Sequence, residues 1–442
     1  NYWAPAPQAA QDMMRAVAAA LALAVASSAD VLVDEGLQRH FDVIKAAIGE
    51  ELGSDGSTST DKCVVSDSNA CALKDLDTTT STVVYPGAGT RCIFSPEISG
   101  DYGFQVFPGD RSKLLLYFQG GGACWDKVST VLPMCSTSAS PSGSSGVFDR
   151  DDDRNPYQDW TIVQILYCSG DVHGGNVTRD YNDKLGNPVV QAGALNAQVT
   201  IDWILGQDDL QAVDELVIMG CSAGSIGAQL WSAQALEALK PTGYSKATVF
   251  PDSFVGVFSQ NVEGPLIRDF GYCNSLCPAD LLSKCQAGEL LFADIMDEQL
   301  STAPSVPFAW LNSKADVVQQ SYYMAVALTM YHSTNTTVFI DPAEYYYDVN
   351  ERFEAYYSQH DNAVLYLVQS GQHCYTNNAF MYSADASSKR GGGYSPAVVD
   401  YMAAAASSSG LSGQCDGDVV PLSDRPDSGT EYCDQALDGR VI

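Results

Sequence analysis

Basic residues are scarce in this sequence. Only 23 of its 442 residues are Lys or Arg, against 54 Asp or Glu, which gives a formal net charge of −31. Such a surface repels nucleic acid and anionic membranes, so we expect neither as a partner. It also disfavours a polyanionic polysaccharide unless a local basic patch compensates. Apolar residues still make up 45% of the chain, which is enough for a sizeable core.

Several ligand-binding patterns are also missing. The chain has no pair of Cys-x2-Cys motifs for zinc, no Gly-x-Gly-x-x-Gly, and no Lys-Ser/Thr after a glycine loop. We therefore expect neither a metal nor an organic cofactor. Histidine is rare too, with five residues, and this narrows the choice of a general base.

Cysteine, in contrast, is abundant. Thirteen cysteines indicate an oxidising compartment, so we expect a secreted, disulfide-bonded protein. Two sequons, Asn176-Val177-Thr178 and Asn335-Thr336-Thr337, permit glycosylation if the chain is eukaryotic and secreted.

Residues 1–29 are predicted to comprise upstream sequence and a signal peptide. Arg15 precedes an apolar run over 16–26, which is too short to span a bilayer, and small residues follow it. Met13 or Met14 would then be the true start; an ordinary Ala-rich helix is the alternative. No other stretch is long and apolar enough to predict a transmembrane helix.

The rest of the chain divides by composition. Residues 30–84 read as an N-terminal helix followed by a polar loop, which Cys63 and Cys71 could close. Residues 85–415 alternate predicted strands and helices, and residues 416–442 read as an acidic tail tethered by a disulfide. Such alternation indicates an α/β fold with a mostly parallel sheet flanked by helices. Its main predicted strands are 113–118, 160–167, 216–219, 247–249, 306–311 and 363–368.

The pentapeptide Gly220-Cys221-Ser222-Ala223-Gly224 follows the predicted strand 216–219 and precedes a predicted helix over 225–240. A strand, a Gly-x-Ser-x-Gly turn and a helix form the nucleophile elbow of α/β-hydrolases. Ser222 is therefore the candidate nucleophile. Cys221 is a second possible nucleophile, but we expect it to be a small buried thiol that packs beneath the turn.

The general base can be chosen by elimination. His373 follows the strand 363–368, at the C-terminal edge of the sheet, and comes after Ser222 in the chain. His173 also follows a strand but precedes the serine. The remaining histidines do not follow strand ends: His40, His332 and His360.

The acid that orients the base should lie between Ser222 and His373, because this fold runs Ser, Asp/Glu, His. Asp316 follows the strand 306–311 at the expected edge. Asp252 follows 247–249 and is the rival.

The three glycines 120–122 directly follow the strand 113–118. Such a loop lets backbone N–H groups approach a substrate oxygen closely. The candidate oxyanion hole comprises the N–H groups of Gly121, Gly122 and Ala223.

Taken together, these motifs resemble the pectin acetylesterase/Notum family of secreted serine esterases. The resemblance runs in order over residues 85–415. The motifs that carry it are Leu116 to Cys124, Asn155-Pro156 with Tyr167 to Asp171, Gly220 to Gly224, Asn312 to Asp316 with Gln319, and His373-Cys374.

The resemblance implies an α/β-hydrolase fold, a Ser222–Asp316–His373 triad, and the oxyanion hole named above. It also implies disulfides, for which we expect Cys92–Cys168, Cys124–Cys135 and one local pair among Cys273, Cys277 and Cys285.

The activity implied by the resemblance is hydrolysis of a carboxylic ester by a monomeric esterase. The first choice is removal of O-acetyl groups from a carbohydrate, as in pectin acetylesterases. An esterase for longer acyl chains on lipid or lipidated protein is the alternative, and a large apolar pocket would favour it. A third possibility is a non-catalytic binding member of the fold.

Overall fold

The computed structural model describes most of the chain between residues 60 and 402. The described residues are 60–96, 101–132, 134–330, 340, 342–357, 359–368, 370–382, 398–399 and 401–402. The predicted signal peptide, the predicted helix within 30–50 and the predicted acidic tail lie outside them.

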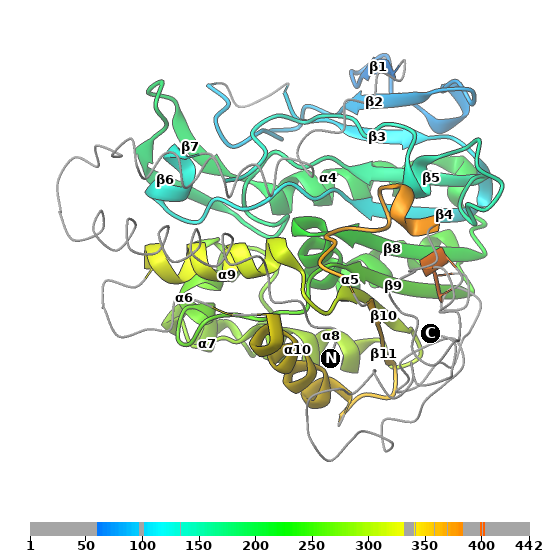
Figure 1. Ribbon diagram of the computed structural model, residues 1–442. Coiled ribbons are helices and arrows are strands. Elements are labelled where there is room, and N and C mark those ends of the chain that lie inside the picture. The colour runs from blue at the N-terminus through cyan, green and yellow to red at the C-terminus, as the bar shows by residue number, and fades with distance from the viewer. Residues whose placement is uncertain are drawn as a thin grey trace.

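A nine-stranded sheet forms the centre of the fold, in the order β1-β2-β3-β5-β4-β8-β9-β10-β11 (Figure 1). Every neighbouring pair is parallel except the two made by β3. A two-stranded hairpin, β6–β7, stands apart. The strands are β1 Thr60–Val64, β2 Ser81–Tyr85, β3 Phe104–Phe107, β4 Asp110–Phe118, β5 Trp160–Ile165, β6 Val177–Asn182, β7 Pro188–Gln191, β8 Glu215–Cys221, β9 Lys246–Asp252, β10 Phe308–Ser313 and β11 Ala363–Val368.

The central strands are continuous buried runs. All six residues of β5, β10 and β11 are buried, as are the last five of β4. Parallel strands consist of such continuous apolar runs because both faces of the sheet are covered. The sequence-based prediction of a mostly parallel α/β sheet is confirmed, and the described fold is that of an α/β-hydrolase.

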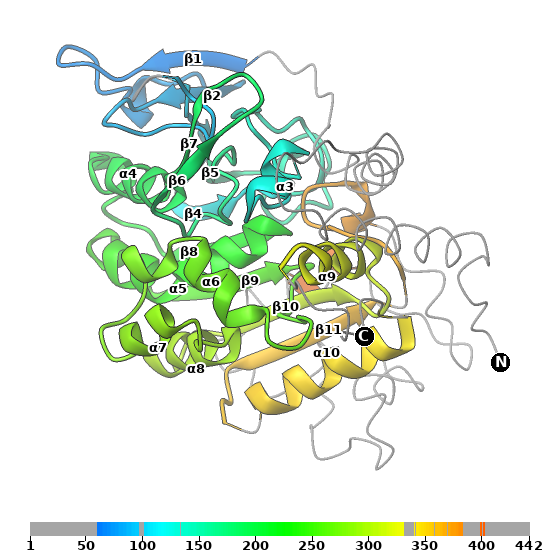
Figure 2. The same ribbon diagram turned by 90° about the vertical axis from the view of Figure 1, so that its left-hand side faces the viewer.

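Helices cover one face of this sheet. Helix α5 packs against β4, β8 and β9, and α4 and α8 pack beside it (Figure 2). Helix α10 joins this layer through Phe353 and Tyr356, whose rings contact Trp310 of β10. The helices are α3 Lys127–Val131, α4 Gly193–Leu205, α5 Ala223–Leu239, α6 Glu263–Asp269, α7 Leu282–Ala287, α8 Phe292–Thr302, α9 Val317–Met330 and α10 Pro342–Tyr357.

The opposite face is covered by segments from elsewhere in the chain. Tyr401 stacks on Tyr366 of β11 and contacts Phe250 of β9. Nearer the middle of the sheet, Tyr117 of β4 contacts Phe148 and lies 3.1 Å, hydroxyl to hydroxyl, from Thr376. Segments far apart in sequence therefore close the second face of the core.

The polar stretch 52–82 departs from expectation. It was expected to be a loop, but its described part contains β1 and the start of β2. The pairing of β1 with β2, and of β2 with β3, stabilises a segment whose composition alone favours a loop.

Five disulfides join described cysteines. The expected pairs Cys63–Cys71, Cys92–Cys168 and Cys124–Cys135 are confirmed. The expected local pair is Cys273–Cys285, which leaves Cys277 as a free thiol. The fifth pair, Cys221–Cys374, was not expected.

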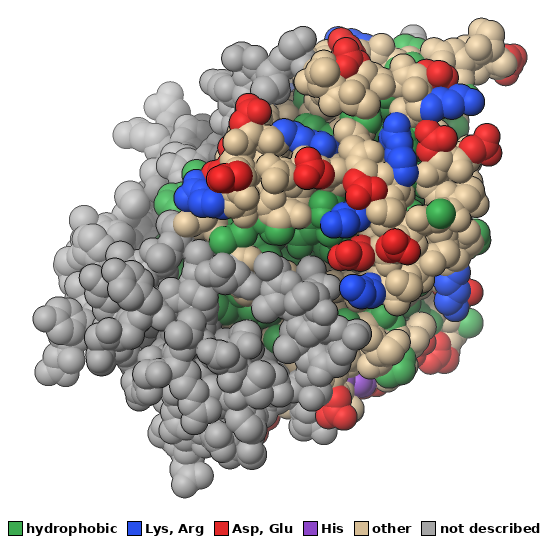
Figure 3. All heavy atoms as spheres, turned by 90° about the vertical axis from the view of Figure 1, so that its right-hand side faces the viewer, with side chains coloured by type: hydrophobic (Ala, Val, Ile, Leu, Met, Phe, Trp, Pro, Cys, Tyr) green, Lys and Arg blue, Asp and Glu red, His purple; other side chains and the backbone are tan. Residues whose placement is uncertain are grey.

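No helix within the described residues is long and apolar enough to cross a bilayer. On the face drawn in Figure 3, the described surface mixes acidic side chains with Lys and Arg.

Candidate active site

Ser222 lies in a sharp turn between β8 and α5. Its backbone has φ 58° and ψ −123°, a strained conformation for a residue with a side chain. The glycines on either side permit the turn, because a Cβ on Gly224 would collide with the Phe118 carbonyl and one on Gly220 with the Gly224 carbonyl. The predicted strand–turn–helix is therefore present, with Ser222 at the first turn of α5.

His373 and Asp316 lie in contact beside this turn. The Nδ1 atom of His373 is 2.7 Å from Oδ2 and 2.9 Å from Oδ1 of Asp316, and both side chains are buried. His373 and Ser222 line the same cavity. Asp316 follows β10 and His373 follows β11, so adjacent parallel strands deliver the two residues to one edge of the sheet.

The Asp316 carboxylate is held by several further donors. The backbone N–H groups of Val318 and Gln319 donate to Oδ1 at 3.0 and 2.9 Å, and the Gln319 amide donates to Oδ2 at 2.9 Å. These backbone groups belong to the first turn of α9, whose N–H groups have no partner within the helix. The start of α9 therefore fixes the orientation of the carboxylate.

The rival acid, Asp252, has a different set of partners. Its Oδ2 accepts hydrogen bonds from the backbone N–H groups of Tyr375 and Thr376 and from the Thr376 hydroxyl, each at 2.8 Å. Its Oδ1 accepts one from Ser253. Burial raises the pKa of Asp252, and these hydrogen bonds oppose the increase. Asp252 thus anchors the segment that follows His373.

A disulfide connects the nucleophile turn to the same segment. Cys221 precedes Ser222, Cys374 follows His373, and the two are joined although 153 residues separate them. Cys221 is buried, as expected, but the expectation that it is a thiol is wrong, because its sulfur is bonded to Cys374 and cannot act as a nucleophile. The sulfur atoms and the His373 ring lie within 4.8 Å of one another, but the disulfide occupies both sulfurs, so this cluster does not suit a metal ion.

The glycine loop after β4 borders the cavity next to Ser222. Gly122 and Ala223 line the cavity, whereas Gly121 is not among its lining residues. The Gly121 carbonyl instead accepts a hydrogen bond from the Ser136 N–H at 2.7 Å. Gly121 and Gly122 have φ values of 141° and 72°, which favour glycine.

His173 contacts the residue that precedes this loop. Its Nε2 lies 2.8 Å from the carbonyl oxygen of Gln119, and its ring contacts Phe118 and Tyr167. Burial lowers the pKa of His173 to about 4, which keeps the ring neutral and able to donate from Nε2. Among the other histidines, His360 lies 2.7 Å from Asp297, while His40 and His332 lie outside the described residues.

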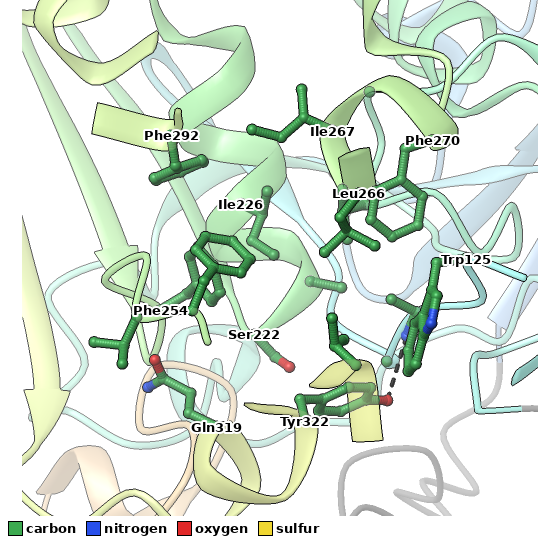
Figure 4. Close-up of a pocket in the computed structure, with 18 of the residues that line it drawn as sticks. Trp125, Ser222, Ile226, Phe254, Leu266, Ile267, Phe270, Phe292, Gln319 and Tyr322 are labelled. Atoms are coloured by element: carbon green, nitrogen blue, oxygen red, sulfur yellow. Dashed lines mark hydrogen bonds between the residues drawn. The ribbon is translucent and has the colours of Figure 1, made fainter. Parts of the chain in front are cut away.

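The cavity in front of Ser222 is large and mostly apolar. The space not filled by atoms, counted together with the part that is open to solvent, is about 1020 Å³. In Figure 4, the Ser222 hydroxyl faces a space bordered by aliphatic and aromatic side chains. The walls come from α5, the segment after β9, α6, α8, α9 and the glycine loop, and include Ile226, Phe254, Leu266, Phe292, Tyr322 and Trp125.

Asp171 is a buried carboxyl in the same wall. It accepts hydrogen bonds from the Ser169 hydroxyl at 2.6 Å and from the Gly193 N–H, at the start of α4, at 2.7 Å. Burial raises the pKa of Asp171 to about 6, and these hydrogen bonds oppose the increase. These hydrogen bonds connect the segment after β5 to the start of α4.

A nucleophile elbow, a buried His–Asp pair and a glycine loop on a parallel sheet define the class of α/β-hydrolases. The chain matches the family described as Pectinacetylesterase over residues 99–405, and it belongs to that family.

Among curated proteins there is no match to this chain. Two crystal structures titled as the Wnt deacylase Notum from Drosophila are similar to it at 17% sequence identity. One has a TM-score of 0.48 and covers 73% of this chain and 92% of that chain. The other has a TM-score of 0.46 and covers 68% and 88%. At these TM-scores the likeness bears on neither substrate nor mechanism.

Three features of the site were missed by sequence reasoning. These are the Cys221–Cys374 bridge, the anchoring role of Asp252 and the apolar cavity. The first had a signal, because each cysteine is the immediate neighbour of a candidate catalytic residue. The other two depend on contacts between distant segments and have no local pattern.

Proposed function

We propose that this protein is a serine carboxylesterase whose acyl-binding cavity takes an apolar acyl group longer than acetyl. Ser222 is the nucleophile, His373 the general base and Asp316 the residue that orients the base. The N–H groups of Gly121, Gly122 and Ala223 are the proposed oxyanion donors.

In the proposed reaction, His373 takes the proton of Ser222 as the serine oxygen bonds to the ester carbonyl carbon. The negative charge on the carbonyl oxygen is stabilised by the proposed backbone N–H donors. Two of the residues that supply them, Gly122 and Ala223, line the cavity. Collapse breaks the bond to the alcohol, which takes its proton from His373. Water then releases the acid from the acyl-enzyme by the same steps.

The observation that carries the proposal of a longer acyl chain is the apolar cavity. An acetyl group would place a single methyl against walls that offer many aliphatic and aromatic contacts. Each further methylene buried there contributes about 0.8 kcal/mol, or roughly a fourfold gain in binding.

Hydrolysis of p-nitrophenyl esters from acetate to palmitate tests this proposal. We expect kcat/KM to increase with chain length beyond acetate. Ser222→Ala should lower turnover by about 10⁴-fold or more. Ser225→Ala is the matched control, because it makes the same change three residues along α5 and should retain activity.

The outcomes of this series differ in meaning. A maximum at acetate would contradict the acyl-chain proposal and favour the second candidate, removal of O-acetyl groups from a polysaccharide, which family membership supports. No turnover by folded protein, together with no labelling of Ser222 by a fluorophosphonate probe, would favour a non-catalytic binding protein.

We also infer that the protein folds in an oxidising compartment and acts outside the cell. Five disulfides among the described residues support this inference, because such bonds persist mainly in secreted proteins. Recovery of the protein from culture medium, against retention in cell lysate, tests it.

A further inference from the structure

Tyr322 connects α9 to the glycine loop. It lies six residues after Asp316, lines the cavity, and packs its ring edge-on against Trp125, with ring centroids 6.2 Å apart. Its hydroxyl donates to the Met134 carbonyl at 2.6 Å and lies 3.3 Å from the Ala123 backbone nitrogen, whose N–H it accepts. The second contact is drawn as a dashed line in Figure 4.

The hydroxyl fills the space next to Gly122. A Cβ on Gly122 would collide with both the Tyr322 hydroxyl and the Met134 carbonyl. Gly122 therefore lies against these two oxygen atoms and also lines the cavity.

Both peptide groups that flank Gly122 are held in place. On the N-terminal side, the Gly121 carbonyl accepts the Ser136 N–H at 2.7 Å. Since a trans peptide directs its C=O and N–H in opposite directions, this contact aims the Gly122 N–H away from Ser136. On the C-terminal side, the Ala123 N–H is shared between the Met134 carbonyl, at 2.9 Å, and the Tyr322 hydroxyl.

We propose that Tyr322 is a positioning residue for the oxyanion hole: its hydroxyl fixes the peptide after Gly122, the Gly121–Ser136 contact fixes the peptide before it, and the two together hold the Gly122 N–H toward the reacting carbonyl. This inference rests on the proposed esterase function. Oxyanion donors act because they are oriented before the charge develops, and a run of glycines has little orientation of its own. The first turn of α9 holds Asp316 and its second turn holds the glycine loop, so one helix aligns two parts of the site.

Tyr322→Phe tests the inference, because it removes the hydroxyl and keeps the ring that packs on Trp125. We expect kcat for the preferred p-nitrophenyl ester to fall about tenfold with KM changed less than twofold. The thermal midpoint should stay within a few degrees of the wild type. Tyr347→Phe is the control, since it removes a hydroxyl from an exposed tyrosine of α10 that does not line the cavity, and it should retain kcat.

A thionoester substrate, in which sulfur replaces the carbonyl oxygen, distinguishes a role in positioning the oxyanion hole from a purely structural role. Thiocarbonyl sulfur accepts hydrogen bonds poorly, so the ratio of oxoester to thionoester rates measures the use of the oxyanion hole. We expect this ratio to fall in Tyr322→Phe by about the factor lost in kcat, and to be unchanged in Tyr347→Phe. Equal loss on both substrates would overturn the inference, as would an unchanged kcat.

Failure of the underlying function gives a different result. If wild-type protein shows no Ser222-dependent turnover of any ester, the proposed function is overturned and this inference falls with it. If wild type turns over esters and Tyr322→Phe behaves identically, only the role of Tyr322 is overturned.

Discussion

The edge of the sheet that carries Ser222, Asp316 and His373 is built in the opposite way to the wall of the cavity. At the edge, Asp316 and Asp252 each accept several hydrogen bonds from fixed donors, and a disulfide joins the turn of Ser222 to the segment after His373. The wall is formed largely by apolar side chains from α5, α6, α8 and α9, whose contacts have no strict direction. In the proposed esterase, the chemistry at this edge therefore depends on orientation, while selection of the acyl group depends on volume.

The largest effect should come from an isosteric change at the edge. We expect Asp316→Asn to lower kcat by about 10⁴-fold, because the amide cannot hold His373 in the tautomer that accepts a proton from serine. The thermal midpoint should change little. Steady-state kinetics with the preferred ester, beside a melting curve, measure both quantities.

Asp252→Asn makes the same change at the other buried carboxylate. It should lower kcat less than a hundredfold and cost about 1–3 kcal/mol of unfolding free energy, since an amide cannot accept all four hydrogen bonds. If Asp252→Asn were the more damaging of the two to kcat, the assignment of Asp316 as the orienting acid would be wrong.

The contrasting prediction concerns the cavity wall. Leu266 of α6 projects into the cavity near Ser222, and Leu266→Trp should fill part of it (Figure 4). We expect kcat/KM for octanoate esters to fall about tenfold or more relative to acetate esters. Leu266→Met, which conserves volume, should keep the wild-type profile. The same ratio of octanoate to acetate rates in wild type and Leu266→Trp would argue that the acyl chain lies elsewhere.

The disulfide Cys221–Cys374 should matter for both stability and geometry. We expect Cys221→Ser with Cys374→Ser to lower kcat about tenfold and the unfolding free energy by about 2–5 kcal/mol. Cys63→Ser with Cys71→Ser is the control, because that bridge lies near β1 at the far edge of the sheet. It should affect stability without changing kcat. Similar kcat values in both double variants would show that the first bridge does not align the site.

The last prediction concerns stability alone and is a pH dependence of the unfolding free energy caused by His173. Its pKa is about 4 in the folded protein and about 6.5 when unfolded. Between these values the unfolded chain binds a proton that the folded protein does not, so the unfolding free energy falls as the pH drops from 6.5 to 4. The total loss is about 3 kcal/mol.

Denaturant unfolding of wild type and His173→Gln at several pH values measures the contribution of His173 to the unfolding free energy. A glutamine amide can donate to the Gln119 carbonyl but does not titrate. Asp171, whose pKa is raised to about 6, contributes with the opposite sign and is present in both proteins, so it cancels in the difference. A difference that stays constant from pH 7 to 4 would contradict the prediction.

Much of the edge that carries Ser222, Asp316 and His373 could be predicted from local sequence. The predicted strand 363–368 coincides with β11, and the turn at Ser222 lies between a strand and a helix as expected. The polar stretch around β1 was the clearest failure, because its pairing with β2 is a tertiary contact that strand propensity does not show.

The sequence by itself determined which residues follow the ends of the strands. Buried apolar runs specify parallel strands, and the residues that follow them, Ser222, Asp316 and His373, must then meet at one edge. Only the tertiary structure decided which acid contacts the base, which cysteine joins Cys221, how Tyr322 reaches the glycine loop, and how large the cavity is. These features depend on distances between segments that are 57 to 199 residues apart, and no local pattern encodes such distances.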